Sequence, residues 1–289
     1  MRRLPVVLGV LAVGLGASAC NSASSDSSTT TTAPAGTSTT IAAHLKASTT
    51  TLPPAVVTPA GRAATLDMQV ALRHGGRRAS LHYVSTSVGN GVTTTIVGDV
   101  NQTAGTQTVV VSTERVKVSV VIELVGHEAY FRGSAAAVEV VIDLTAREAA
   151  AAADQWVSVV PSDSVYEATA AALTVGSVMS ELALSSPITG VRDIVAQGQP
   201  ALQLSGAWTG NGITAADRAT AELDVTRGPA SLPLSFNGVE PANARASRFT
   251  ASFVVGKWGE QVKVAPPAFS VPLATIIKAT TTTTQPVVV

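Results

Sequence analysis

The feature that most constrains the fold is a series of five runs rich in β-branched residues, joined by very short connections. The runs cover residues 81–88, 92–101, 106–114, 116–125 and 128–132. Asn90-Gly91, Ala104-Gly105 and Gly126-His127 have the composition of tight turns between them. Since strands joined by such short turns must be antiparallel neighbours, this half of the chain predicts a β-meander.

The run 116–125 shows the alternation of a half-buried strand most clearly. Lys117, Ser119 and Glu123 fall on one face. The other face carries only apolar residues, which are Val116, Val118, Val120, Ile122 and Leu124. A period of two residues is typical of a strand with one buried face.

The middle of the chain has helix-start signals. Thr145-x-x-Glu148 reads as a capping box ahead of 149–153, and Ser164-x-x-Glu167 as another ahead of 168–173. A strand-like run at 155–160 separates them.

A further helix is predicted from an apolar stripe and should end before Pro187. The stripe follows i, i+3, i+4, i+7 spacing and comprises Val175, Val178, Met179 and Leu182. Ordinary packing of this stripe onto a sheet is the simplest interpretation.

Strand patterns return at 188–197, 201–208, 219–226, 231–239 and 247–255. Strands, then helices, then strands, without a βαβ rhythm, predict a single α+β domain. About ten antiparallel strands must curl rather than stay flat. We therefore expect a curved antiparallel sheet, an unclosed barrel, with two or three helices covering its concave face.

Cys20, the only cysteine, ends an apolar leader. Arg2 and Arg3 precede the apolar run 4–15, and Ala17-Ser18-Ala19 supply small residues before the cysteine. Residues 1–19 therefore read as a signal peptide, too short to span a bilayer. The ending also resembles a bacterial lipobox, in which cleavage precedes Cys20 and lipid is joined to its sulfur. The alternative is an ordinary A-x-A signal that leaves a free thiol without an internal disulfide partner.

Composition divides the rest of the chain. Residues 21–52 are dominated by Ser and Thr, which cannot bury enough apolar area to offset the entropy of ordering. We expect a lipidated, disordered tether at 20–60, a folded domain at 61–277 and a disordered tail at 278–289. A flexible tether of this length has an r.m.s. span of ~30 Å.

Charge excludes some partners. The chain has 19 basic and 19 acidic residues, so losing Arg2 and Arg3 with the leader leaves a net charge near −2. That balance gives no electrostatic reason to expect a nucleic-acid partner. No second segment is apolar and long enough to span a bilayer, so membrane attachment would depend on the lipid.

Catalytic signatures are absent from the sequence. His44, His74, His82 and His127 do not follow metal-ligand spacing. No nucleophile elbow, P-loop or dinucleotide fingerprint occurs. We therefore expect no enzyme activity, no metal and no cofactor. Asp99, Glu123, Asp143 and Glu148 are scattered in a way that indicates surface solvation.

Arg73, Arg77 and Arg78 form a small basic cluster before the first strand. The simpler interpretation is a solvated loop. The alternative is contact with anionic lipid headgroups.

Several segments, in order, carry a resemblance to a known family. They are KVSVVIELVGHEAYFRG, the Trp-containing DQWVSV, ELALSSP, AQGQPALQLSG, AELDVTRGPASLPLSF and RFTASFVVGKWGEQVKVAPP. With the lipobox and tether before them, they resemble the LolA-like superfamily of envelope lipoproteins and carriers, and most closely the actinobacterial LppX/LprG type. The resemblance covers about residues 66–267 and includes no catalytic motif.

The resemblance implies an unclosed barrel around an apolar cavity, with helices as its lid. Members bind acyl chains of lipids, lipoglycans or lipoproteins and carry them across the envelope. A dry pocket is needed because each CH₂ group exposed to water costs ~0.8 kcal/mol. The implied protein is a monomer, lipid-anchored on the extracytoplasmic face of the cell membrane, whose ligand is an acylated lipid or lipoglycan.

The same resemblance places the cavity lining at inward strand positions and at the helix stripe. The expected residues are Val118, Val120, Ile122, Leu124, Val178, Met179, Leu182, Leu202, Leu204, Leu223 and Val225. Taken singly, each also fits an ordinary core position. The competing hypothesis is an envelope interaction or sensory lipoprotein with a collapsed cavity, which binds a membrane protein or a cell-wall polymer. Only the carrier requires a connected pocket of several hundred Å³.

Overall fold

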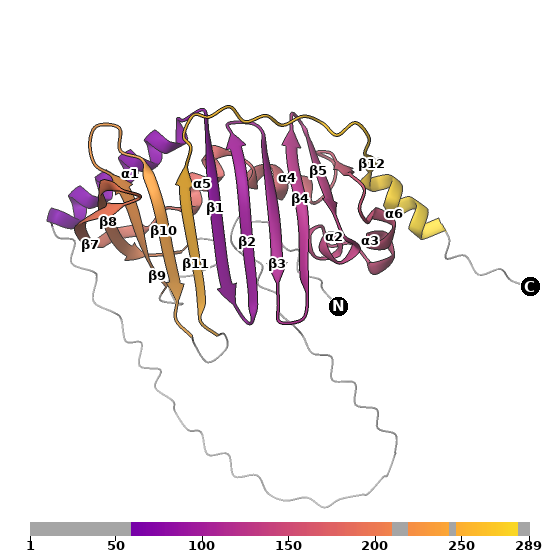
Figure 1. The fold of residues 1–289 in the computed structure, drawn as a ribbon, viewed down its shortest axis with the longest axis horizontal. Coiled ribbons are helices and arrows are strands. Elements are labelled where there is room, and N and C mark those ends of the chain that lie inside the picture. Colours follow the sequence, from indigo (N-terminus) through magenta and orange to yellow (C-terminus); the bar gives the residue numbers. More distant parts are fainter. Residues whose placement is uncertain (1–58, 210–218, 243–246, 283–289) are drawn as a thin grey trace, which may run out of the picture. The chain divides into compact units, whose positions relative to one another are not determined.

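The computed structural model describes residues 59–209, 219–242 and 247–282 (Figure 1). Cys20, the leader and nearly all of the predicted tether lie outside these residues. Twelve strands form one sheet in the order β12-β6-β5-β4-β3-β2-β1-β11-β10-β9-β8-β7. Among the described helices, none combines the length and the apolar character needed to cross a bilayer.

The first five strands form the predicted meander, and each pairs antiparallel with the next. They are β1 (Ser80–Gly89), β2 (Val92–Asn101), β3 (Gly105–Ser112), β4 (Lys117–Val125) and β5 (Glu128–Gly133). Asn90 and Gly91 both have positive φ, 52° and 74°, as a two-residue hairpin turn requires.

The last five long strands form a second antiparallel meander. They are β7 (Ser185–Ala196), β8 (Gln199–Ala207), β9 (Thr220–Thr226), β10 (Pro233–Glu240) and β11 (Phe249–Gly256). β11 pairs antiparallel with β1 and so joins the two meanders. At the far edge, β6 (Val157–Val159) pairs with β5, and β12 (Val271–Pro272) pairs parallel with β6.

The expected fold class is confirmed. The sheet is open because its edge strands, β12 and β7, stand at opposite ends of the strand order. It has twelve strands rather than about ten, and one pairing is parallel. The described helices are α1 (Pro59–Gly76), α2 (Ala135–Val141), α3 (Ala146–Ala152), α4 (Tyr166–Ala172), α5 (Val175–Glu181) and α6 (Leu273–Thr282).

Local capping chemistry explains where α3 begins, but α4 begins without it. At α3 the predicted box is present, because Thr145 accepts from the Glu148 backbone and Glu148 accepts from the Thr145 backbone at 2.8 Å. The predicted box at Ser164 is wrong. Helix α4 starts after Val165 without a side-chain cap, and Asp163 closes the turn before it by accepting from the Val160 N–H at 2.8 Å.

Three helices have no counterpart in the sequence predictions: α1, α2 and α6. Helix α1 starts at Pro59, just ahead of the expected domain start at 61, and buries Gly61, Ala64, Met68, Ala71 and Gly75. Helix α6 continues to Thr282, past the expected domain end at 277.

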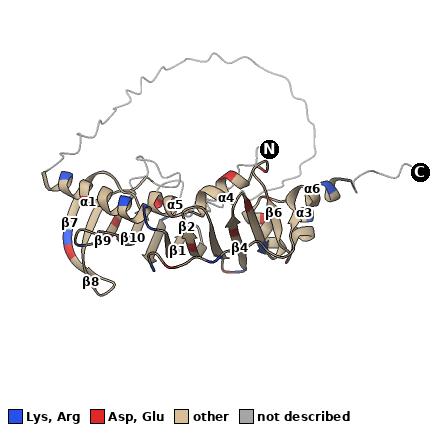
Figure 2. Ribbon diagram, turned by 90° about the horizontal axis from the view of Figure 1, so that it is seen from above, with Lys and Arg blue, Asp and Glu red and all other residues tan. Residues whose placement is uncertain are grey.

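The helices share one face of the sheet. Helix α1 packs against β7, β9 and β10, α2 against β4 and β5, and α4 against β5. Figure 2 shows α1, α4 and α5 along the same side of the strands. Buried side chains from these helices and from the strands form a single apolar cluster. We call the side of the sheet that carries this cluster the inner face and the opposite side the outer face.

Candidate apolar binding face

The inner face is built by strict alternation along the strands. In β1 the positions Leu81, Tyr83, Ser85 and Ser87 are buried, each exposed by 7% or less. Cross-strand register carries this face to its neighbours, as Val109 of β3 lies opposite Val120 of β4. A one-residue slip would turn every such side chain to the outer face, so the apolar pattern fixes the register.

The eleven residues predicted to line a cavity lie in or against this one cluster. Leu204 lies directly opposite Leu223, and Leu202 opposite Val225. Two are only partly buried, which are Val118 and Leu202. The other nine are each exposed by 5% or less, and they are Val120, Ile122, Leu124, Val178, Met179, Leu182, Leu204, Leu223 and Val225. That these side chains contact a ligand stays a prediction.

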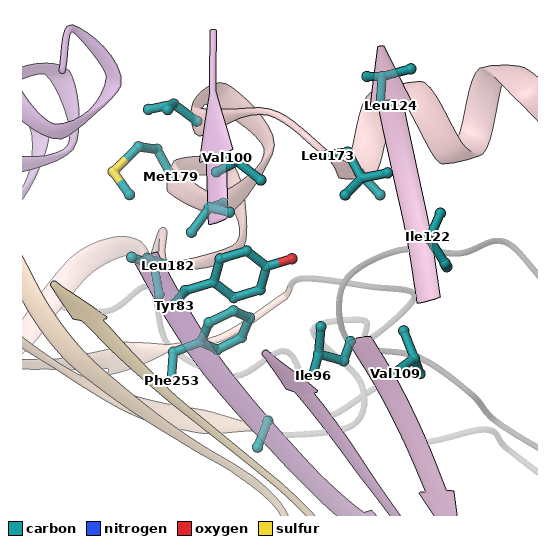
Figure 3. Close-up of a cluster of buried hydrophobic side chains, with 14 of the residues drawn as sticks. Tyr83, Ile96, Val100, Val109, Ile122, Leu124, Leu173, Met179, Leu182 and Phe253 are labelled. Carbon is teal, nitrogen blue, oxygen red and sulfur yellow. The ribbon is translucent and has the colours of Figure 1, made fainter. Parts of the chain in front are cut away.

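The helix stripe reaches the same cluster from the other side. Figure 3 shows Met179 and Leu182 together with Val100 and Leu173 among its side chains. Leu182 is the C-cap residue of α5 rather than a residue within it. Helices α1 and α5 meet closely, because a Cβ added at Gly75 would lie 2.5 Å from the Met179 sulfur.

The sequence predictions missed the aromatic part of this face. Tyr83 and Phe253 stack with ring centroids 6.3 Å apart, as Figure 3 shows. Phe236 meets Trp208 edge-on at 5.3 Å and Phe253 at 6.3 Å. All four rings are exposed by 1% or less. The alternation of Phe236 and Phe253 with polar residues in their runs was the available signal.

One hydrogen bond lies within this apolar face. The Tyr83 hydroxyl donates to the side-chain oxygen of Gln107 at 2.7 Å, and both residues are buried. Burial, and then the nearby Asp99 carboxylate, raise the pKa of the Tyr83 hydroxyl well above that of a free phenol. Tyr83 is therefore a neutral donor here.

Small residues line up across part of the inner face. Gly206, Ala221, Gly238 and Ala251 are consecutive cross-strand partners in β8, β9, β10 and β11. Trp208 covers Gly238 in this row, since a Cβ there would lie 2.6 Å from its ring. The Trp208 Nε1 donor is buried and has no hydrogen-bond partner.

On β7 to β10 the outer face carries a network of hydrogen-bonded polar side chains. Arg192 donates to the Gln203 side-chain oxygen at 2.6 Å, and the Gln203 amide donates to Asp224 at 3.0 Å. Ser235 donates to the second Asp224 oxygen at 2.5 Å. In this part of the sheet the two faces therefore differ, with the apolar cluster on the inner face and the polar network on the outer face.

Two histidines have distinctive surroundings in the part of the chain that the structure describes. His82 Nδ1 lies 2.9 Å from an Asp99 carboxylate oxygen. His74 Nδ1 is buried without a partner. Across residues 59–209, 219–242 and 247–282, no group of three His, Cys, Asp or Glu side chains could hold a metal ion.

A polar cavity of about 210 Å³ lies at the end of the sheet where β1 begins. None of the eleven predicted lining residues borders it. Its lining comprises Leu81, Asp99, Thr106, Lys257, Glu260, Gln261, Val262 and Lys263. Its charged lining does not suit an acyl chain.

Comparison with known proteins gives solved structures alone, since no family model and no curated protein matches this sequence. LprF from Mycobacterium bovis aligns over 72% of this chain and 98% of its own, with 16% identity and a TM-score of 0.45. The Mycobacterium tuberculosis lipoprotein LppX aligns over 71% and 99%, with 13% identity and a TM-score of 0.44. A DUF1329 family protein from Desulfovibrio piger aligns over 72% and 96%, with 8% identity and a TM-score of 0.29.

Lipoproteins of the LppX type, to which the sequence predicts a likeness, are among these similar solved structures.

Proposed function

We propose that this protein is an extracytoplasmic carrier or binding protein for acylated lipids or lipoglycans, which holds their acyl chains against the inner face of its sheet. It acts as a monomer, anchored to the membrane through lipid on Cys20. Its function is to bind, without making or breaking covalent bonds.

The observation that carries this proposal is the one-sided apolar cluster. Its side chains come from both meanders and from every helix on the inner face. Of the eleven residues predicted to contact a ligand, nine belong to the cluster and two pack against it. Helices α2, α3, α4 and α5 each span only seven residues. The inner face is therefore covered by separate short helices rather than by one continuous helical layer. Short helices can separate from a sheet at lower cost than long ones because each buries little area.

The energetic case follows from transfer of hydrocarbon out of water. Each CH₂ group that moves onto an apolar face contributes ~0.8 kcal/mol, so a chain of ordinary lipid length supplies on the order of 10 kcal/mol. Displacing side chains from this face offsets part of that energy. On β7 to β9 the hydrogen-bonded polar residues of the outer face offer an acyl chain no comparable surface.

One observation favours a second function. Nine of the eleven candidate residues are exposed by 5% or less, which is also what a filled interior gives. A collapsed LolA-like domain would serve as an envelope interaction or sensory module, binding a membrane protein or a cell-wall polymer.

The test is native mass spectrometry of the protein purified from its host, followed by solvent extraction and identification of bound lipid. If the protein is a carrier, the wild-type chain should carry one stoichiometric acylated molecule. Val120→Trp and Leu182→Trp place bulk on the inner face and should each lower the bound fraction at least several-fold. Val97→Trp is the matched control, since Val97 is 41% exposed on the outer face of β2.

Circular dichroism and thermal unfolding establish that each variant is folded before its lipid is measured. Folded inner-face variants that keep wild-type lipid would contradict the carrier. A wild-type protein that carries no lipid from its own host would do the same and would favour the interaction module.

A further inference from the structure

Five cationic residues gather where β1 begins. Arg73 lies in the last turn of α1, and Arg77 and Arg78 follow that helix directly. Lys257 and Lys263 come from the segment after β11 and line the polar cavity at this end of the sheet. Figure 2 shows Lys and Arg residues, in blue, on α1 and on the chain that leaves it. We call these five residues the cationic end.

Hydrogen bonds fix both contributing segments to the end of the sheet at which β1 begins. The Gly259 N–H donates to the Ser80 carbonyl at 2.9 Å, so the segment that carries both lysines runs beside the start of β1. The Gln102 amide donates to the carbonyls of Gly76 and Arg78, at 2.9 and 2.6 Å. The turn that carries the arginines is therefore fixed to the end of β2.

No residue of the cationic end takes part in the ion pairs found among the described residues, which include His82–Asp99, Arg192–Glu222 and Arg227–Asp193. Arg73, Arg77, Lys257 and Lys263 are exposed, and Arg78 is half-buried.

Helix stability explains only part of this arrangement. A cation in the last turn of a helix is stabilised by the helix dipole, which accounts for Arg73. The effect fades beyond the last turn, so it does not account for Arg78, and Lys257 and Lys263 belong to a different segment.

The distribution of charge favours a broad anionic partner over a small anion. The cavity itself holds two lysines against the carboxylates of Glu260 and Asp99, so it is close to neutral. The excess positive charge comes from the three arginines, which stand outside the cavity lining. A surface of many phosphates suits cations that come from two segments, residues 73–78 and residues 257–263, and lie both inside and outside the cavity lining.

We propose that the cationic end docks on an anionic phospholipid surface. Each Lys or Arg near such a membrane adds attraction, and the contributions accumulate over the patch. Docking orients the end of the sheet at which β1 starts toward the lipid headgroups. This surface acts whether or not the inner face carries an acyl chain, so its test does not depend on the proposed carrier function.

The experiment measures co-sedimentation of the full chain with phosphatidylcholine vesicles, with and without phosphatidylglycerol. All proteins carry Cys20→Ser, so that a lipid on Cys20 cannot hold them on the vesicle. The test variants are Arg77→Gln/Arg78→Gln and Lys257→Asn/Lys263→Gln, in which Asn suits the positive φ of 48° at Lys257. The matched control is Arg115→Gln/Lys117→Gln, which removes two exposed charges at the opposite end of β3 and β4.

Wild type and control should bind the phosphatidylglycerol vesicles equally and lose that binding as salt is raised. Each test variant should bind on the order of tenfold more weakly, because two charges are removed. Three results would overturn the proposal: no binding by wild type, equal weakening of the control, or displacement by millimolar inorganic phosphate at constant ionic strength. The last of these would indicate a small-anion site instead of a membrane surface.

Discussion

The hydroxyl of Tyr83 donates a hydrogen bond to the side-chain oxygen of Gln107 across the full width of strand β2. Tyr83 lies on β1 and Gln107 on β3, and the residue between them in register is Gly98. The ring lies directly over that glycine, where a Cβ would be 2.4 Å from the Tyr83 Cε1 atom. A polar pair is thereby satisfied inside an apolar layer.

Tyr83→Phe should lower the free energy of unfolding by about 1–3 kcal/mol, because it leaves the buried Gln107 oxygen without a donor. Urea denaturation measures the change. The double variant Tyr83→Phe/Gln107→Met removes both polar groups and should recover most of the loss. A double variant no more stable than Tyr83→Phe would show that the pair is not the cause.

Gly98→Ala should cost about 1–3 kcal/mol of stability, since its methyl group must displace the Tyr83 ring. Gly256→Ala provides the comparison, because a Cβ there meets nothing within 4 Å. It should change stability by no more than about 0.5 kcal/mol. Equal effects of the two substitutions in thermal unfolding would contradict the close packing at Gly98.

Alkaline pH should destabilise the protein through its buried phenols. Burial, a hydrogen bond with Glu128 and the charge of Glu128 raise the pKa of Tyr130 to about 12, and burial raises the pKa of Tyr83 as well. An unfolded tyrosine ionises near pH 10, so the folded state retains protons that the unfolded state releases above that pH. The contribution of these two tyrosines to stability should therefore be constant below about pH 10 and fall as the pH rises toward 12.

Ultraviolet titration of phenolate, compared between folded and urea-unfolded protein, measures this effect. The unfolded chain should ionise its three tyrosines together near pH 10, and the folded chain should lag behind. Tyr130→Phe should make the alkaline loss of stability shallower. Identical folded and unfolded titration curves would contradict the prediction.

Thr145→Ala should lower stability by about 1 kcal/mol, because it removes the hydroxyl that caps α3. Ser164→Ala serves as the control, since Ser164 is exposed and α4 has no side-chain cap. Chemical denaturation should therefore show a lower free energy of unfolding for Thr145→Ala and an unchanged one for Ser164→Ala. A loss at Ser164 equal to that at Thr145 would mean that the sequence motif, rather than the observed cap, governs α4.

Features that depend on neighbouring residues could be predicted from the sequence. The hairpin between β1 and β2 follows from Asn90-Gly91, because both residues adopt the positive φ that their side chains allow. The four inward residues of β4 follow from simple alternation. Helix α1 was missed because its buried stripe is mostly Ala and Gly, which gives little apolar contrast, and because Gly75-Gly76 reads as a loop.

Features that depend on tertiary structure could not be predicted. Alternation defines two faces of each strand, but only the packing of α1, α4 and α5 decides which of them is inner. The aromatic cluster joins Trp208, Phe236 and Phe253 from three strands or strand ends, and no local spacing reveals that they meet. The cationic end likewise unites residues 73–78 with residues 257–263.

The pairing of β1 with β11 has a consequence for how this sheet is completed. Val88 of β1 pairs with Thr250 of β11. Among the described strands, β1 is the first to be synthesised and β11 is the last long one. Contacts so distant along the chain slow folding, because a very large loop must close before they form. Until then β1 is a bare edge to which other chains can add. The edge of β1 therefore stays open to pairing with other chains until nearly all of the described sheet has been synthesised.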